Sequence, residues 1–269
     1  MLVVVVLVGA LVVAKIALSR TTTATTVAAV GSIPAPADAV ARVSRVPVAV
    51  LSKVGAGSYA GGFVAIPKAS PLTSSGKPLV VYEGAEYCPY CAAQRWALVA
   101  ALSRFGTFHG LGATHSSTTD VYPGTNTFSF YGATYSSPYL ALQTVEAYSN
   151  VPKGNFYAPL QTPTPAQQAL LSTYDAPPYV PSSEAGAIPF VDYANHYVSV
   201  GASYNPQVLR GLSLQQISAA LADPASPVAK AIDGTANVMT AAVCVITKNA
   251  PAPVCRTPLV TGLAARLGG

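Results

Sequence analysis

Residues 80–96 read VVYEGAEYCPYCAAQRW, and this stretch decides the fold class. It begins within a short apolar run, residues 77–82, that is typical of a fully buried strand. Over residues 88–104 the apolar side chains recur at helical spacing. A buried strand is therefore expected to lead directly into a helix, with Cys88 and Cys91 at the junction.

The Cys88-Pro89-Tyr90-Cys91 motif has the spacing of a redox-active dithiol. At the first turn of a helix the unpaired amides and the helix dipole stabilise a thiolate, so we expect Cys88 to be accessible and to have a pKa below ~8.5. Cys91, one turn further along, is expected to be buried and close enough to form a disulfide with Cys88. The motif therefore predicts attack by Cys88 and resolution by Cys91.

A zinc knuckle and an inert structural disulfide are the alternatives for this motif. Zinc needs two more ligands at suitable spacing, but His109, His115 and His196 are isolated in the sequence and the second cysteine pair lies near the far end. The glycine patterns of nucleotide-binding loops are also absent from the sequence. We expect neither a metal nor a cofactor.

The composition excludes several classes of protein. Of 269 residues, 51% are hydrophobic and only 9% are charged, with a net charge of +5, which is the reverse of the balance in a disordered chain. A mean hydropathy of +0.41 would suit a polytopic membrane protein, but only Leu2 to Leu18 approaches the length of a bilayer crossing. The positive charges are scattered, so no nucleic acid partner is expected.

Residues 1–18 are predicted to form a transmembrane signal anchor, and residues 19–39, rich in Thr, Ala and Pro, a tether. A cleaved signal peptide and a buried core helix are the alternatives for the apolar segment. Because Lys15 and Arg20 lie on its carboxyl side, outward orientation of the domain requires a basic segment before Met1. We expect a single-pass protein of the cell membrane with domain 40–269 extracytoplasmic.

Strand-like and helix-like segments alternate in the rest of the chain, which indicates an α/β fold. Residues 107–145 mix short β-rich runs with turns, and a helix is expected over 165–174 with Thr164 as its cap. Residues 188–200 predict a hairpin that turns around Ala194-Asn195. Two or three helices are expected after residue 212.

The quoted block resembles the active-site stretch of the thioredoxin superfamily, and its CPYC tetrad is similar to that of glutaredoxins. The resemblance implies a thioredoxin-like α/β fold with a cis-proline at Pro189, packed against the dithiol. Because about 100 residues separate Cys91 from Pro189, it also implies a long insertion at about 107–185 between the CxxC helix and the cis-proline strand. C-terminal helices complete the expected fold.

A closer resemblance is to a membrane-anchored family known as domain of unknown function 929. It rests on GAEYCPYCAAQRWALVAALSRFG at 84–106, SSPYL at 136–140, IPFVDYANHYVSVGASY at 188–204 and the tail from Cys244 to Cys255. Together these cover most of residues 45–255. The family has no settled function, so this resemblance bears on the fold more than on the activity.

The sequence departs from the thioredoxin pattern at one position. Thioredoxins have a buried acid six residues before the first Cys, and here Tyr82 stands there. Glu83 and Glu86 are the nearest acids and the possible proton acceptors, although Glu83 should point to the face opposite Tyr82 and is either a base or a surface residue. Two carboxylates near Cys88 would raise the pKa of its thiol.

Simpler roles are expected for the other prominent side chains. Arg95 is expected to be a surface or ion-pair residue, and Trp96 a core residue. The 15 tyrosines could line a peptide groove, but scattered Tyr residues are ordinary in secreted domains.

Cys244 and Cys255 flank a Pro-rich turn, and their spacing predicts a structural disulfide. A second redox pair that passes electrons to Cys88 and Cys91, or two free thiols, are the alternatives. The even cysteine count, the apolar amino-terminal segment and the tether together favour an oxidising, extracytoplasmic compartment.

The sequence thus predicts a membrane-tethered thiol-disulfide oxidoreductase with Cys88, Cys91 and Pro189 at its site. Its partners would be protein or small-molecule thiols and disulfides, and the membrane through its amino-terminal segment. The alternative is a non-catalytic binding or structural module that keeps the fold and uses its cysteines only in stabilising disulfides.

Overall fold

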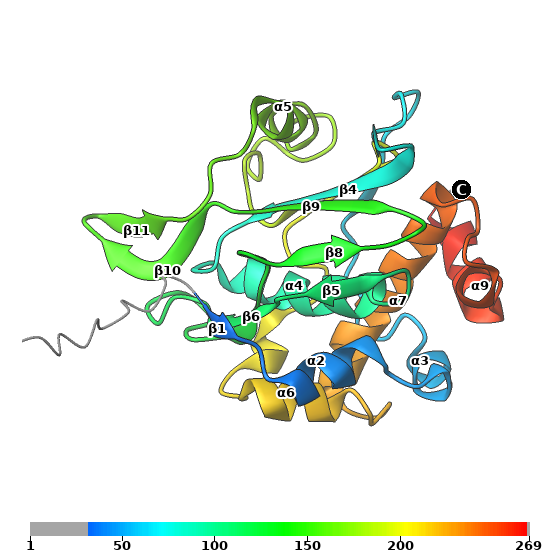
Figure 1. Ribbon diagram of the computed structural model, residues 1–269, viewed down its shortest axis with the longest axis horizontal. Helices are drawn as coiled ribbons and strands as arrows, with labels where there is room; N and C mark the ends of the chain where they lie inside the picture. The colour runs from blue at the N-terminus through cyan, green and yellow to red at the C-terminus, as the bar shows by residue number, and fades with distance from the viewer. Residues whose placement is uncertain (1–31, 268–269) are drawn as a thin grey trace, which may run out of the picture.

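The computed structural model describes residues 32–267 and has a mixed α/β fold around one six-stranded sheet (Figure 1). The sheet has the order β2-β13-β12-β4, and both β3 and β9 pair with β4. β9 runs parallel to β4, with Leu79 opposite Ala141 and Gly84 opposite Glu146, whereas the other pairs in this sheet are antiparallel. The strand that leads into the cysteine motif is therefore central.

Among the described residues the strands are β1 (Ile33–Pro34), β2 (Phe63–Ala65), β3 (Thr73–Ser74), β4 (Lys77–Gly84), β5 (Thr107–His109), β6 (Gly112–His115), β7 (Asn126–Ser129), β8 (Thr134–Ser136), β9 (Ala141–Glu146), β10 (Tyr148–Lys153), β11 (Phe156–Pro159), β12 (Phe190–Tyr193) and β13 (Tyr197–Val200). The helices are α2 (Ala37–Ser44), α3 (Val48–Val54), α4 (Pro89–Leu102), α5 (Pro165–Tyr174), α6 (Leu214–Ala220), α7 (Pro227–Ile246), α8 (Ala252–Cys255) and α9 (Pro258–Arg266), with a 3-10 turn at Pro206–Leu209.

Each face of the sheet has its own helical cover, because successive side chains of a strand point to opposite faces. Val191 and Tyr193 of β12 pack in the main core with α4 and α7, whereas Phe190 packs against Leu170 and Leu171 of α5. Figure 1 shows α5 on one side of β4 and β9, and α4 with α7 on the other. The dithiol helix therefore lies in the larger of the two cores.

α7 is a core helix of the domain. It is continuous over Pro227–Ile246, where the sequence shows two apolar runs, and it packs along α4. Among the described residues it alone is long and apolar enough to cross a membrane, but 83% of that apolar window is buried inside the domain. The predicted anchor, residues 1–18, lies outside the described residues.

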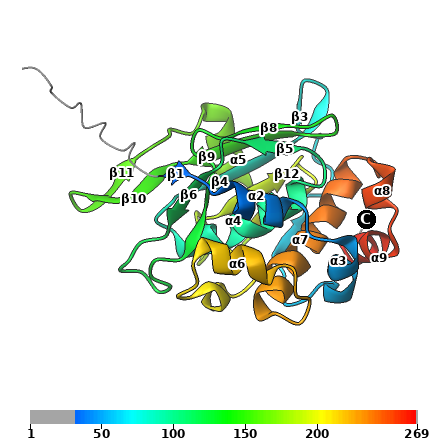
Figure 2. The same cartoon turned by 60° about the horizontal axis from the view of Figure 1, so that its bottom comes forward.

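The folded domain begins before residue 40. Ile33 and Pro34 form β1, which pairs with β6, and β6 pairs in turn with β7, so the three strands form a small sheet. Ala39 of α2 is fully buried. Figure 2 shows α2 and α3 on the same side of the sheet as α4, α6 and α7. α2 contacts α4 and α6, and α3 contacts α7. The tether predicted over residues 19–39 is therefore too long at its carboxyl end, and its part up to residue 31 lies outside the described residues.

The expected insertion at 107–185 is not a separate unit. Within this range β9 joins the central sheet and α5 covers one face of that sheet. The same range also contains three small antiparallel pairings: β5 with β8, β6 with β7 in the sheet that β1 joins, and β10 with β11.

Two local predictions are confirmed. The helix over 165–174 begins at a capping box in which Thr164 and Gln167 exchange hydrogen bonds. The hairpin of β12 and β13 turns at Ala194 and Asn195, whose φ angles of 58° and 56° suit a tight two-residue turn.

Candidate dithiol site

Cys88 is the N-cap residue of α4, and its sulfur accepts a hydrogen bond from the Cys91 amide at 3.2 Å. Pro89 follows as the first helical residue, where an amide hydrogen would have no partner. A hydrogen bond from the Cys91 thiol lowers the pKa of Cys88 most; burial opposes this, and the Cys91 amide and the Arg95 guanidinium lower it further. The expectation of an accessible thiol is wrong, because Cys88 is only 5% exposed.

Cys91 lies behind Cys88 and is fully buried, as expected. Burial and the neighbouring Cys88 raise the pKa of the Cys91 thiol well above its usual value. Gly84 of β4 provides the space, since a Cβ at that position would lie 3.1 Å from the Cys91 sulfur and would collide with the Tyr82 hydroxyl. The two thiols are thus made chemically unequal by their positions.

Arg95 is a fully buried cation one turn of α4 after Cys91. Its guanidinium donates hydrogen bonds to the Ala85 carbonyl at 2.9 Å and the Phe128 carbonyl at 3.2 Å, and it forms an ion pair with Glu146 at 3.2 Å. The expectation of an ion pair is met, but that of a surface position is not. Trp96 is fully buried in the core, as predicted.

Glu146 is the acid that sequence reasoning missed. It is the last residue of β9 and pairs with Gly84, so the parallel register brings its carboxylate to Arg95. Burial raises the pKa of Glu146 to about 7, against the lowering effect of Arg95. Its second carboxylate oxygen has no hydrogen-bond partner among residues 32–267. A buried acid that titrates near neutral pH therefore lies within the same cluster of side chains as the dithiol.

The two acids predicted from the sequence lie in different surroundings, Glu83 within β4 and Glu86 in the turn after it. Glu86 is fully buried, accepts a hydrogen bond from the Ser129 hydroxyl at 2.5 Å, and is close enough to Arg95 for the guanidinium to oppose the rise in pKa that burial causes. Glu83 points to the α5 face, as predicted, where it pairs with Phe190 in the sheet and is nearly buried rather than exposed.

The expected rise in the pKa of Cys88 from two nearby carboxylates is therefore wrong. Glu83 is on the other face of the sheet, and the charge of Glu86 is opposed by the buried guanidinium of Arg95. The pKa of Cys88 is lowered instead, by hydrogen bonds from the Cys91 thiol and amide and by the charge of Arg95, which could not be placed beside Cys88 from the sequence.

Pro189 lies beside the dithiol. The Ile188-Pro189 peptide is cis and immediately precedes β12. The Cys88 thiol donates a hydrogen bond to the Ile188 carbonyl at 3.7 Å. The structure thus brings Cys88, Cys91 and Pro189 together from segments about 100 residues apart. In the described part of the chain, no group of three or more His, Cys, Asp or Glu side chains is arranged to hold a metal ion.

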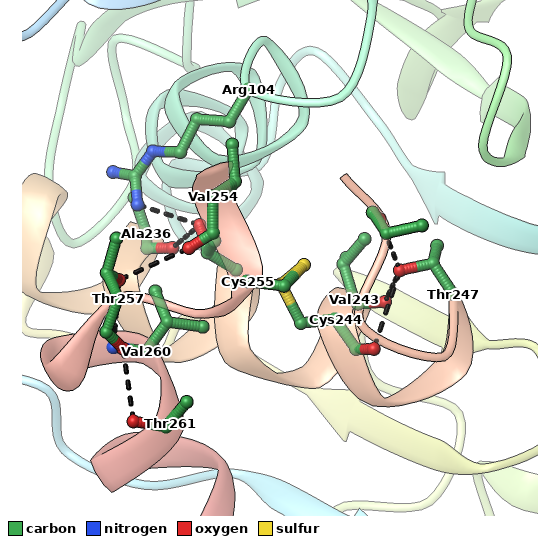
Figure 3. Close-up of a disulfide and its surroundings, with 12 residues drawn as sticks. Arg104, Ala236, Val243, Cys244, Thr247, Val254, Cys255, Thr257, Val260 and Thr261 are labelled. Atoms are coloured by element: carbon green, nitrogen blue, oxygen red, sulfur yellow. Dashed lines mark hydrogen bonds between the residues drawn. A yellow bond between two sulfur atoms is a disulfide. The ribbon is translucent and has the colours of Figure 1, made fainter. Parts of the chain in front are cut away.

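The second cysteine pair is a disulfide between α7 and α8 (Figure 3). The Cα atoms of Cys244 and Cys255 are 5.4 Å apart. Val254, next to Cys255, lines a cavity of about 220 Å³ together with Ala100, in the last turn of α4, and Arg104, just after this helix. The disulfide is therefore near that end of the helix.

The two cysteine pairs lie at opposite ends of α4. Cys88 caps the amino end of this helix, whose 14 residues span roughly 20 Å at ~1.5 Å per residue. Direct thiol exchange requires contact between sulfur atoms. The geometry therefore favours a stabilising disulfide at Cys244 and Cys255 over a second redox pair.

Replacing both Cys244 and Cys255 by Ser is expected to lower the free energy of unfolding by about 3 kcal/mol, because the disulfide closes a loop of about 12 residues in the unfolded chain. Turnover of a small disulfide should be unchanged. Urea unfolding and a turnover assay measure the two quantities. Full stability with lost turnover would instead assign the pair to electron transfer.

The sequence model of a family described as a domain of unknown function (DUF929) matches residues 65–245. The match extends from the end of β2 almost to the end of α7 and includes Cys88, Cys91, Pro189 and Cys244. Comparisons with curated proteins and with solved structures gave no match. Because the matched segment exceeds half of the chain, the chain belongs to the DUF929 family.

Proposed function

We propose that this chain is a thiol-disulfide oxidoreductase with a thioredoxin-like fold. The observation that carries the proposal is the unequal placement of the two thiols: Cys88 caps the amino end of α4 and accepts a hydrogen bond from the Cys91 amide, whereas Cys91 is fully buried behind it. This placement lowers the pKa of Cys88 and raises that of Cys91. An attacking thiol must ionise near neutral pH, whereas a resolving thiol stays protonated until the mixed disulfide forms.

The order of elements supports the thioredoxin-like part of the proposal. The dithiol helix α4 directly follows the central strand β4, and the cis peptide at Pro189 precedes β12 beside that strand. β9 and α5 lie between them in the chain and complete the sheet and its second face. The small sheets formed by β5 to β8 and by β10 with β11 are additions to this arrangement.

The reaction is a two-electron exchange between dithiol and disulfide. The Cys88 thiolate attacks one sulfur of a substrate disulfide, which forms a mixed disulfide and releases the other substrate sulfur as a thiolate that takes up a proton. Cys91 then gives up its proton and attacks the Cys88 sulfur, which releases the second substrate thiol. The substrate gains two electrons, Cys88 and Cys91 form a disulfide, and a dithiol donor must reduce them again.

Glu146 and Arg95 support the resolving step. With a pKa of about 7, Glu146 can accept the proton that Cys91 loses. The Tyr82 hydroxyl accepts a hydrogen bond from the Arg95 Nε at 3.4 Å, and both this hydroxyl and the Cys91 sulfur lie against Gly84. Arg95 also stabilises the Cys88 thiolate, since its charge lowers the pKa of that thiol. In this proposal Glu146 takes the role of the missing acid at position 82.

We also propose that residues 1–18 attach the domain to the cell membrane and that the domain lies outside the cytoplasm. The Cys244–Cys255 disulfide supports this placement, because structural disulfides persist in oxidising compartments.

A non-catalytic binding or structural module is the second candidate. The 5% exposure of Cys88 favours it, because a substrate disulfide has to reach the attacking sulfur.

Alkylation with iodoacetamide between pH 5 and pH 9 distinguishes these candidates. We expect Cys88 to react first, with a rate that rises with pH and levels off below ~8.5, since the thiolate is the reactive form. Cys91 should stay unmodified in the folded chain. Mass spectrometry of the digested protein reports the modification at each site. Cys88→Ser is the control, in which Cys91 is the remaining thiol of the motif. Reaction of both thiols only after unfolding would support the non-catalytic module.

A further inference from the structure

We propose that the aromatic surface around the dithiol binds an extended, apolar segment of a polypeptide that carries the substrate disulfide. This aromatic patch consists of Tyr87, Tyr90, Tyr122, Tyr148, Phe156 and Tyr157. The inference rests on the proposed function and names the substrate class of the same site.

The β10–β11 hairpin supplies half of the aromatic patch. Tyr148 and Phe156 remain 37% and 49% exposed although their rings contact each other edge to face at 4.9 Å. Figure 1 shows this hairpin extending beyond the end of the central sheet. Val151 of the same hairpin is 43% exposed. Large apolar side chains grouped on a protruding hairpin are typical of a surface that binds a partner.

Direct contacts join the hairpin to the two residues that precede the dithiol. Tyr87, the residue before Cys88, stacks on Tyr157 with ring centroids 4.4 Å apart and meets Phe156 edge to face at 5.3 Å. The Tyr148 carbonyl accepts a hydrogen bond from the Glu86 amide at 2.9 Å. A ligand on the hairpin would therefore lie next to the attacking sulfur.

The aromatic patch continues within the motif itself. Tyr90, between the two cysteines, is 40% exposed and contacts Tyr122 edge to face at 5.8 Å. Val121 beside it is 67% exposed. Aromatic residues thus stand on both sides of Cys88 in the chain, at Tyr87 and Tyr90, and each contacts a further ring, which suits a polypeptide that passes over the thiol better than a compact molecule.

The charges near the site favour the same occupant. The hairpin segment 147–159 contains one charged residue, Lys153, and the cation nearest the dithiol, Arg95, is fully buried and paired with Glu146. Of these two cations only Lys153, the last residue of β10, is exposed to a small anionic disulfide, and the one beside the dithiol is buried. A neutral polypeptide with aromatic or aliphatic residues beside its cysteine matches both the charge and the exposed rings.

The test measures the turnover of two disulfide substrates by the wild-type chain and by the double variant Tyr148→Ser/Phe156→Ser. The substrates are 2-hydroxyethyl disulfide and a ten-residue peptide disulfide with Phe and Leu beside its cysteine. We expect the variant to lose about tenfold or more in kcat/KM for the peptide, the size of loss expected when exposed aromatic contacts are removed, and to keep its turnover of the small disulfide. Val48→Ser is the matched control, because Val48 is 67% exposed on α3.

The other outcomes have definite meanings. Equal losses on both substrates, or no loss on the peptide, would overturn the inference. It would also be overturned if the wild type were a dimer and the variant a monomer that still turned over the peptide at the wild-type rate. If the wild type turns over neither substrate, the proposed function fails. In that case the aromatic patch is tested alone, by measuring the binding of a fluorescein-labelled peptide to Cys88→Ser/Cys91→Ser with and without the hairpin substitutions. If the hairpin substitutions do not weaken this binding, the inference about the aromatic patch is overturned.

Discussion

Replacing Cys88 by Ser is expected to reduce disulfide turnover to the uncatalysed rate, because a serine hydroxyl does not ionise near neutral pH and cannot attack a disulfide sulfur. Replacing Cys91 by Ser should have a different effect. Cys88 can still attack in that variant, but nothing resolves the product, so a mixed disulfide with the substrate should accumulate. Mass spectrometry under non-reducing conditions measures this species.

The control for both single variants is Cys244→Ser/Cys255→Ser, which removes the two cysteines at the other end of α4. This control should retain turnover. Turnover by Cys88→Ser, or the same behaviour in Cys88→Ser and Cys91→Ser, would contradict the assigned order of attack and resolution.

The parts of the site that the sequence predicts are local. Cys88 and Cys91 are three residues apart on one helical turn, so their spacing alone indicates a reactive pair. The hairpin after Pro189 is likewise determined by short-range alternation and a two-residue turn. The position of Pro189 beside the dithiol was available only from the resemblance to thioredoxins, since no local rule places residue 188 next to residue 88.

The Arg95–Glu146 pair could not be predicted, because it depends on the register of β9 against β4. These residues are separated by 51 positions along the chain, and a shift of β9 by one residue would turn Glu146 to the other face of the sheet. The composition does carry a weak signal. With only 9% of residues charged, a lone Glu at the end of an apolar strand and a lone Arg within an apolar helix are candidates for a buried pair.

Replacing Arg95 by Met is expected to lower the free energy of unfolding by about 3 to 5 kcal/mol at pH 8, the usual cost of removing one member of a buried ion pair. The variant leaves the Glu146 carboxylate buried without its cation. Arg42→Met is the matched control, because the Arg42–Asp38 pair is 3.8 Å apart and more than half exposed and should contribute at most about 1 kcal/mol. Urea unfolding of both variants measures the difference.

The pH dependence separates the charge of Arg95 from its packing. Without the guanidinium, the pKa of Glu146 in the folded state should rise further above its unfolded value, from the present value of about 7. When the pKa of a carboxyl group is higher in the folded state than in the unfolded state, the protein becomes less stable as the pH increases through the folded pKa. The folded state then has to release a proton and bury the charge. The loss caused by Arg95→Met should therefore be larger at pH 8 than at pH 5.

The same substitution should also move the alkylation profile of Cys88 to higher pH, because the guanidinium lowers the pKa of that thiol. Arg95→Lys keeps the charge and should restore most of the alkylation profile, although a lysine cannot reproduce the contacts to Ala85, Phe128 and Glu146 together. An equal loss of stability at both pH values, with an unchanged Cys88 profile, would show that Arg95 acts only by filling space. In that case the proton acceptor for Cys91 would have to be sought in a group that is not paired with Arg95.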